Sequence, residues 1–177
     1  MATMTDDTSR TSHAIEVRAS GVVAVTPAEA WELVSDTSRY AEWVAGTAAV
    51  TGTDGPAREG STYEEVNPIM GPWRAKTQWT VVEFDAPRRQ IHRSEDVPFA
   101  SEFLVSIDVA PSGDGSEVTM TLRATPSLGV LGASVLRLRK SQTRKDNERT
   151  VQRLGELAAP QAERSGDGKR QRLGSTA

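Results

Sequence analysis

The amino-acid sequence predicts an α+β fold in which a curved antiparallel β-sheet of about seven strands wraps around one long C-terminal α-helix. Residues 15–25 have the pattern of a strand, two short helical segments follow, and residues 48–125 alternate between strand patterns and turn residues. A long helical pattern at 127–159 ends this order. The concave face of such a sheet needs a cover, and only this helix is long enough to provide it.

Two short helices are expected directly after the first strand. Thr26, Pro27 and Glu29 form the signature of a helix start, with an N-cap, a proline in the first turn and the glutamate of a capping box. A second helix is expected after Asp36 or Ser38, either of which is a suitable N-cap. The residues expected on the buried sides are Ala30, Trp31, Leu33 and Val34 in the first helix and Tyr40, Trp43 and Val44 in the second.

Six further strands are expected before the long helix. Their predicted positions are 47–53, 60–66, 73–85, 88–95, 100–110 and 116–125. Short turn segments rich in Gly, Pro, Asp and Asn separate them, for example Asp54-Gly55-Pro56. Because parallel strands need crossovers of about a dozen or more residues, these short connections indicate an antiparallel sheet.

The C-terminal helix has two apolar stripes that do not share a face. One stripe comprises Leu131, Val135 and Leu138, and the other comprises Val151, Leu154 and Ala158. At about 100° per residue the two stripes lie on nearly opposite sides of a straight helix. We therefore expect a break, a kink or separate helices within 129–141, aided by Gly129 and Gly132, and an end of the helix at Pro160.

Length and composition favour a single globular domain at 14–159. The chain has 177 residues, and the segments 1–13 and 160–177 are polar, so both are expected to be disordered tails. The basic cluster Lys169, Arg170 and Arg172 is either a solvated tail or a contact for nucleic acid or anionic lipid. The net charge of −3 argues against a nucleic-acid partner for the whole chain.

Several classes of protein are excluded by the residues that the chain lacks. The absence of cysteine excludes disulfides, thiolate metal sites and a cysteine nucleophile. No apolar run reaches the roughly 18 residues of a membrane span, and residues 1–13 contain no secretory signal pattern, so a cytoplasmic location is expected. One of the two histidines lies in the N-terminal segment, so neither a metal site nor a cofactor is expected.

Four segments resemble the START-like (SRPBCC, Bet v 1-like) superfamily, and in particular its polyketide cyclase/dehydrase and lipid-transport branch. They are TPAEAWELVSD at 26–36, SRYAEW at 38–43, WTVVEFDAPRR at 79–89 and LGEL at 154–157. The resemblance implies a helix-grip fold with an internal cavity for a lipid, hormone, pigment or polyketide intermediate. Only some members are enzymes and they share no catalytic motif, so the resemblance assigns no catalytic residue.

An apolar cavity of this kind is lined by the inward residues of the strands. Period two predicts three inner sets: Trp73, Ala75, Thr77, Trp79 and Val81; Phe103, Val105, Ile107 and Val109; and Val118, Met120 and Leu122. Met70 and Phe99 are expected as apolar lips of a gate formed by the loops 67–72 and 96–100 and the segment 128–132. The candidate ligand contacts are Trp73, Trp79, Val81, Arg93, Phe99, Phe103, Val105, Ile107, Met120, Asn147 and Val151.

The strand at 88–95 supplies the candidate acid–base groups. If Ile91 points inward, period two also turns Arg93 and Glu95 inward and leaves His92 at the surface. A buried arginine needs a carboxylate partner, which Glu95, Glu64 or Glu102 can supply. Such a pair would bind a ligand carbonyl, carboxylate or phenolate, or else it lies at a wet pocket mouth. Arg93, Glu95 and Glu64 are thus the catalytic candidates.

Polar residues on the long helix are the second group of candidates. Asn147, Arg144 and Thr143 share a face with Val151 and Leu154, so they either bind the ligand or meet solvent where the helix overhangs the sheet.

Three functions are compatible with these patterns. The leading hypothesis is binding or carriage of an apolar metabolite, and the alternatives are a cofactor-independent cyclase, aromatase or dehydratase and a protein-interaction module. A wholly apolar cavity would favour the carrier, and a cavity filled by side chains would favour the interaction module. An inward carboxylate with a raised pKa would favour the enzyme. The identity of the ligand and the oligomeric state stay open.

Overall fold

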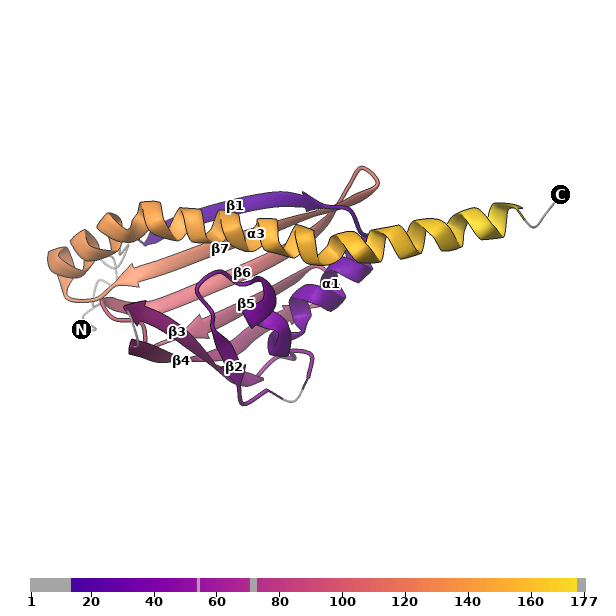
Figure 1. The fold of residues 1–177 in the computed structure, drawn as a ribbon. Helices are drawn as coiled ribbons and strands as arrows, with labels where there is room; N and C mark the ends of the chain where they lie inside the picture. Colours follow the sequence, from indigo (N-terminus) through magenta and orange to yellow (C-terminus); the bar gives the residue numbers. More distant parts are fainter. Residues whose placement is uncertain (1–13, 54, 71–72, 175–177) are drawn as a thin grey trace, which may run out of the picture.

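A computed structural model describes residues 14–53, 55–70 and 73–174, which form one antiparallel sheet and four helical segments. The seven strands lie in the order β1-β7-β6-β5-β4-β3-β2, and the long helix α3 crosses the sheet (Figure 1). The strands are β1 (Ile15–Val23), β2 (Ala49–Thr51), β3 (Thr62–Met70), β4 (Trp73–Asp85), β5 (Arg89–Ser94), β6 (Ala100–Ser112) and β7 (Gly115–Pro126). The helical segments are α1 (Pro27–Ser35), η1 (Thr37–Arg39), α2 (Tyr40–Trp43) and α3 (Gly129–Gly174). The predicted helix-grip architecture is confirmed.

The capping predicted for the short helices is confirmed. The Thr26 N–H donates to Glu29 Oε2 at 2.9 Å, and the Glu29 N–H donates to Thr26 Oγ1 at 3.4 Å, so α1 begins with a reciprocal capping box. The Ser38 N–H donates to Asp36 Oδ1 at 3.1 Å at the start of η1. These caps fix the direction of α1 and α2, which bury Trp31, Tyr40 and Trp43 against the sheet.

The core lies between the sheet, α1, α2 and the middle of α3. Val151, Leu154 and Ala158 form the part of α3 that packs into it. The contact with β1 is so close that a Cβ placed on Gly21 would lie 2.5 Å from Val151 Cγ1. A side chain at position 21 would therefore force Val151 or the helix to shift, which glycine avoids.

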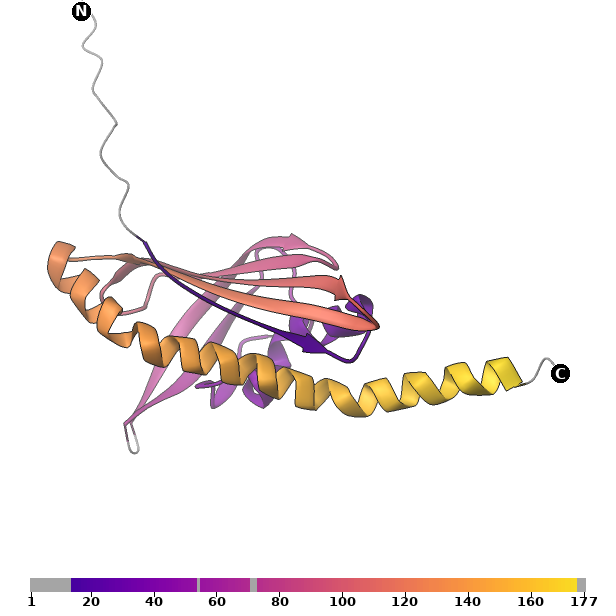
Figure 2. The same cartoon turned by 90° about the horizontal axis from the view of Figure 1, so that it is seen from above.

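The helix α3 is continuous over its 46 residues, and the break predicted within 129–141 is wrong. Figure 2 shows a gentle curve instead. A break would leave up to about eight backbone groups without partners. In the continuous helix, Leu131 and Leu138 of the predicted stripe face solvent, and Val135 is half-buried. The helix also passes Pro160, where its end was expected. Residues 160–174, expected as a tail, are thus helical, while residues 1–13 lie outside the described part.

Candidate functional site

A cavity of about 400 Å³ lies between the inner face of the sheet and the N-terminal half of α3. Seven of the predicted ligand contacts line it: Trp79, Phe99, Phe103, Val105, Ile107, Met120 and Asn147. Val81 and Val151 are buried but do not line it, and Trp73 is exposed at the start of β4. The loop 97–99 borders the cavity, and Phe99 is also 39% exposed, so the cavity reaches the surface there. Nothing is described for the side chain of Met70, the other predicted lip.

The predicted orientation of β5 is wrong. Gln90, His92 and Ser94 are buried, whereas Arg93 and Glu95 face solvent and form an ion pair at 3.7 Å. The prediction assumed that the apolar Ile91 points inward, whereas β5 alternates regularly with Ile91 on the outer face. The pairing of β4 with β5 also shifts by one residue at a β-bulge between Val81 and Glu83. Without the bulge, Val81 would oppose Arg93 and turn it inward; with it, Val81 opposes His92. Directly opposed residues share a face of the sheet, so His92 joins Val81 inside.

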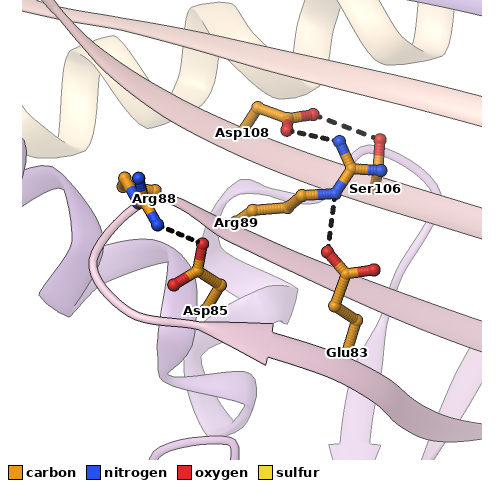
Figure 3. A network of polar contacts seen from close by, with 6 residues as sticks. All are labelled: Glu83, Asp85, Arg88, Arg89, Ser106 and Asp108. Atoms are coloured by element: carbon orange, nitrogen blue, oxygen red, sulfur yellow. Dashed lines mark hydrogen bonds and ion pairs between the residues drawn. The ribbon is translucent and has the colours of Figure 1, made fainter.

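The outer face of β4, β5 and β6 is a charged surface, as Figure 3 shows. The Arg89 guanidinium lies 2.9 Å from both Glu83 and Asp108, and Arg88 pairs with Asp85 at 2.8 Å. All five side chains are more than a third exposed, so each pair contributes only about 0–1 kcal/mol. These charged side chains are therefore exposed to solvent and do not line the cavity.

The third catalytic candidate, Glu64, also lies outside the cavity. Its side chain is about one-third exposed and pairs with Lys76 at 2.8 Å. The hydrogen bond from Lys76 holds the pKa of Glu64 below its ordinary value. Arg93, Glu95 and Glu64 are therefore all on the outer face, and none of them borders the cavity.

A hydrogen-bonded chain of buried polar side chains contributes Tyr40, Tyr63 and His92 to the cavity lining. The Tyr40 O–H donates to the Val34 carbonyl at 3.0 Å, and Gln90 Nε2 donates to the Tyr40 oxygen at 3.1 Å. His92 Nδ1 lies 3.0 Å from the Tyr63 oxygen, and Nε2 lies 3.4 Å from the Tyr40 oxygen. Both contacts are satisfied when Nε2 carries the hydrogen and Tyr63 donates to Nδ1.

His92 is a structural member of this chain and not a base for neutral pH. Burial lowers its pKa to about 3, so the ring stays neutral. Burial likewise raises the pKa of Tyr40 and of Tyr63 well above the ordinary value. The three side chains thus form an uncharged, hydrogen-bonded wall.

Glu65 is the acid–base group that the sequence analysis missed. It is 7% exposed, borders the cavity and accepts a hydrogen bond from Thr47 Oγ1 at 3.1 Å. Burial raises its pKa to about 7, against the opposing hydrogen bonds of Thr47, Asn67 and Trp79. The structure supplies the signal that the sequence lacks: Tyr63 opposes the inward Trp79, and period two from Tyr63 turns Glu65 inward.

Two buried N–H groups border the same cavity without a geometrically satisfied hydrogen bond. Asn147 on α3 is 4% exposed, and its Nδ2 has no partner. The Trp79 indole N–H lies near enough to Glu65 to favour the ionised carboxylate but does not reach hydrogen-bonding geometry. The cavity therefore combines apolar walls with two available donors and one titratable carboxyl group.

The structure contains neither a metal-binding cluster nor a membrane-spanning helix in its described ranges. No three His, Asp or Glu side chains of these residues are grouped so that they could hold a metal ion. None of the helices described is long and apolar enough to cross a membrane.

Known structures share this fold at low sequence identity. TTHA0849 from Thermus thermophilus is 21% identical, with a TM-score of 0.64 over 82% of this chain and 98% of that one. The di-domain ARO/CYC StfQ from the steffimycin biosynthetic pathway is 9% identical, with a TM-score of 0.70 over 85% of this chain, which spans 52% of StfQ. Ara h 8.0201 is 10% identical, with a TM-score of 0.53 over 78% of this chain and 97% of that one.

No curated protein is matched by the chain. The family model described as polyketide cyclase / dehydrase and lipid transport matches residues 14–159, which is most of the chain. The chain belongs to the polyketide cyclase/dehydrase and lipid-transport family of the START-like superfamily.

Proposed function

We propose that the protein binds a largely apolar small molecule that carries a carbonyl or similar oxygen, and that it does so in the cavity beneath α3. The observation that carries this proposal is the buried Asn147 amide, which borders an otherwise mainly apolar space with its Nδ2 unpaired. A buried donor without a partner costs about 1–3 kcal/mol. An oxygen acceptor on a bound molecule removes that cost.

The shape and lining of the cavity favour a planar or aromatic guest. Its volume of about 400 Å³ is at the small end of the usual range for ligand sites, about 300–1,000 Å³. Trp79 packs against Phe103 at 5.9 Å and is stacked on Tyr63 at 6.4 Å, so aromatic faces and edges surround the space. StfQ is named as an ARO/CYC protein of a biosynthetic pathway, and a similar fold here is compatible with a polyketide-like guest.

A matched pair of probes tests this proposal. 2-Acetylnaphthalene and 2-ethylnaphthalene differ in one carbonyl oxygen, so their affinities measured by calorimetry isolate its contribution. One hydrogen bond of about 1 kcal/mol predicts that the ketone binds roughly fivefold more tightly. The preference disappears in Asn147→Leu and persists in Gln142→Leu, an exposed control on the same helix. Equal affinities for the two probes, or no binding of either, would overturn the proposal.

A second candidate function, acid–base conversion of the guest, is favoured by Glu65. In the dehydration of a β-hydroxy ketone, the Glu65 carboxylate removes a proton from the α-carbon and leaves an enolate. As the carbonyl group re-forms, the electron pair of the enolate makes the α,β carbon–carbon double bond and the carbon–oxygen bond of the β-hydroxyl breaks. The protonated Glu65 returns its proton to the leaving oxygen, which departs as water. A carboxyl group with a pKa of about 7 is suited to both steps. This is the chemistry of a cofactor-independent cyclase, aromatase or dehydratase.

The conversion of 4-hydroxy-4-phenylbutan-2-one to its enone, followed by absorbance, distinguishes binding from catalysis. Catalysis predicts turnover that falls about a hundredfold or more in Glu65→Gln while affinity for 2-acetylnaphthalene is kept. Glu64→Gln is the matched control, since its side chain lies on the outer face. Wild-type protein that binds the ketone but never accelerates the dehydration would leave binding as the function.

A further inference from the structure

Large apolar side chains are exposed where the cavity reaches the surface. The N-terminal part of α3 and the two adjoining loops carry five of them, which we call the rim: Phe99, Leu128, Val130, Leu131 and Leu138. Val130 is 82% exposed and Leu138 is 86% exposed. Several exposed apolar side chains of this size on neighbouring segments are typical of an interaction surface.

The rim is built into the fold. Phe99 and Leu128 have φ values of 67° and 58°, in the left-handed region that residues with a side chain rarely occupy. The Ser127 N–H donates to the Phe99 carbonyl at 2.9 Å and ties the two loops together. Gly132 lets α3 approach them closely, since a Cβ there would lie 3.1 Å from the Phe99 carbonyl oxygen and closer still to that of Ser127. The apolar side chains are therefore held in a preformed arrangement.

Positive charge is concentrated beside the rim although the whole chain carries a net charge of −3. Residues 129–145 contain five basic residues and no acidic residue: Arg137, Arg139, Lys140, Arg144 and Lys145. All five are exposed. In the described part of the chain, the one ion pair that this set forms joins Arg144 to Glu148 at 3.6 Å. Arg18 of β1 borders the same shallow depression as Arg137, Lys140 and Arg144, and the one acidic residue in that lining is Glu16.

We propose that the rim docks on the surface of an anionic lipid membrane, with its apolar side chains in the interfacial layer and the basic residues against the headgroups. Apolar residues next to clustered Lys and Arg are the combination that holds helices at such surfaces. A second copy of the chain fits less well, because it would bring two positively charged regions together. Docking in this way would place the open end of the cavity where apolar molecules dissolve.

Flotation of the full chain with vesicles tests the proposal. We expect association with vesicles that contain phosphatidylglycerol, little association with pure phosphatidylcholine vesicles, and release at high salt. The double variants Leu131→Ser/Leu138→Ser and Arg137→Glu/Lys145→Glu should each lower partitioning at least about tenfold, because all four side chains are exposed and none supports the core. Val22→Ser is the control, since Val22 is also exposed but lies at the other end of β1.

Three results would overturn the membrane proposal. The first is the absence of any association with anionic vesicles. The second is an equal loss of vesicle partitioning in Val22→Ser and in Leu131→Ser/Leu138→Ser. The third is a dimer that dissociates only in Leu131→Ser/Leu138→Ser, in a protein that does not associate with vesicles. A purified acidic carrier protein that binds the rim while vesicles do not would assign the surface to a protein instead. Calorimetry with 2-acetylnaphthalene on the same variants reports separately on the cavity.

Discussion

The buried Glu65 carboxyl group makes the stability of the protein depend on pH in an unusual direction. In the unfolded chain this side chain ionises near its ordinary pKa of 4.5, and in the folded chain its pKa is about 7. Between these values the native state binds more protons than the unfolded state, so the free energy of unfolding falls as pH rises and levels off above about pH 7. The difference between the two pKa values corresponds to a change of about 3 kcal/mol in the free energy of unfolding.

Glu65→Gln should remove this dependence, because a glutamine imitates the protonated carboxyl group and still accepts the hydrogen bond from Thr47. We expect the variant to match the wild type near pH 4 and to exceed it by up to about 3 kcal/mol near pH 8. For a chain of this length that is a rise in Tm of roughly 5–10 °C. Urea denaturation at a series of pH values, with calorimetric Tm as a second readout, measures the difference.

The neighbouring Glu64→Gln provides the control for this series. Its side chain lies on the outer face in contact with Lys76, and its pKa is lowered and not raised, so the wild-type pH dependence above about pH 5 should remain. A Glu65→Gln variant with the wild-type slope, or with lower stability than the wild type near pH 8, would refute the assignment of Glu65 as a carboxyl group protonated by burial.

Three further substitutions test other parts of the structure. Gly21→Ala should lower the free energy of unfolding by about 1–3 kcal/mol, because the added methyl group clashes with Val151. Val151→Ala in the same chain should recover part of that loss. If urea denaturation shows that the losses of the two substitutions simply add, the two residues are not in contact. Tyr63→Phe should cost about 1–3 kcal/mol because His92 Nδ1 loses its donor, and an unchanged urea midpoint would show that the contact contributes nothing. Asn147→Leu should raise the Tm of the empty protein while weakening ketone binding, and a lowered Tm would argue that the amide is satisfied without a guest.

Strong local patterns explain why most of the fold could be predicted. The capping box at Thr26 and the apolar alternation of Phe103, Val105 and Ile107 are determined by neighbouring residues, and the structure keeps them. The side of β5 that faces inward has no comparable signal, because the apolar Ile91 indicated the inner face, whereas the polar Gln90, His92 and Ser94 are buried in its place.

Only part of the candidate site could be predicted from the sequence, because the pairing of the strands decides which side chains face inward. Asn147 could be identified because it interrupts an apolar helical stripe. Glu65 could not be identified from its own strand, since a charged residue next to Glu64 looks like surface until the pairing of Tyr63 with Trp79 is known. The apolar stripe at Leu131 and Leu138 predicted a broken helix because burial was assumed, whereas both side chains remain in solvent.

Native mass spectrometry of the protein purified from its own producing cells, followed by solvent extraction, tests the central claim most directly. The account predicts a stoichiometric adduct of a mainly apolar molecule with at least one carbonyl or hydroxyl oxygen, and a reduced occupancy in Asn147→Leu. The absence of any adduct, together with no change in Tm on addition of 2-acetylnaphthalene, would contradict the claim that the cavity binds such molecules.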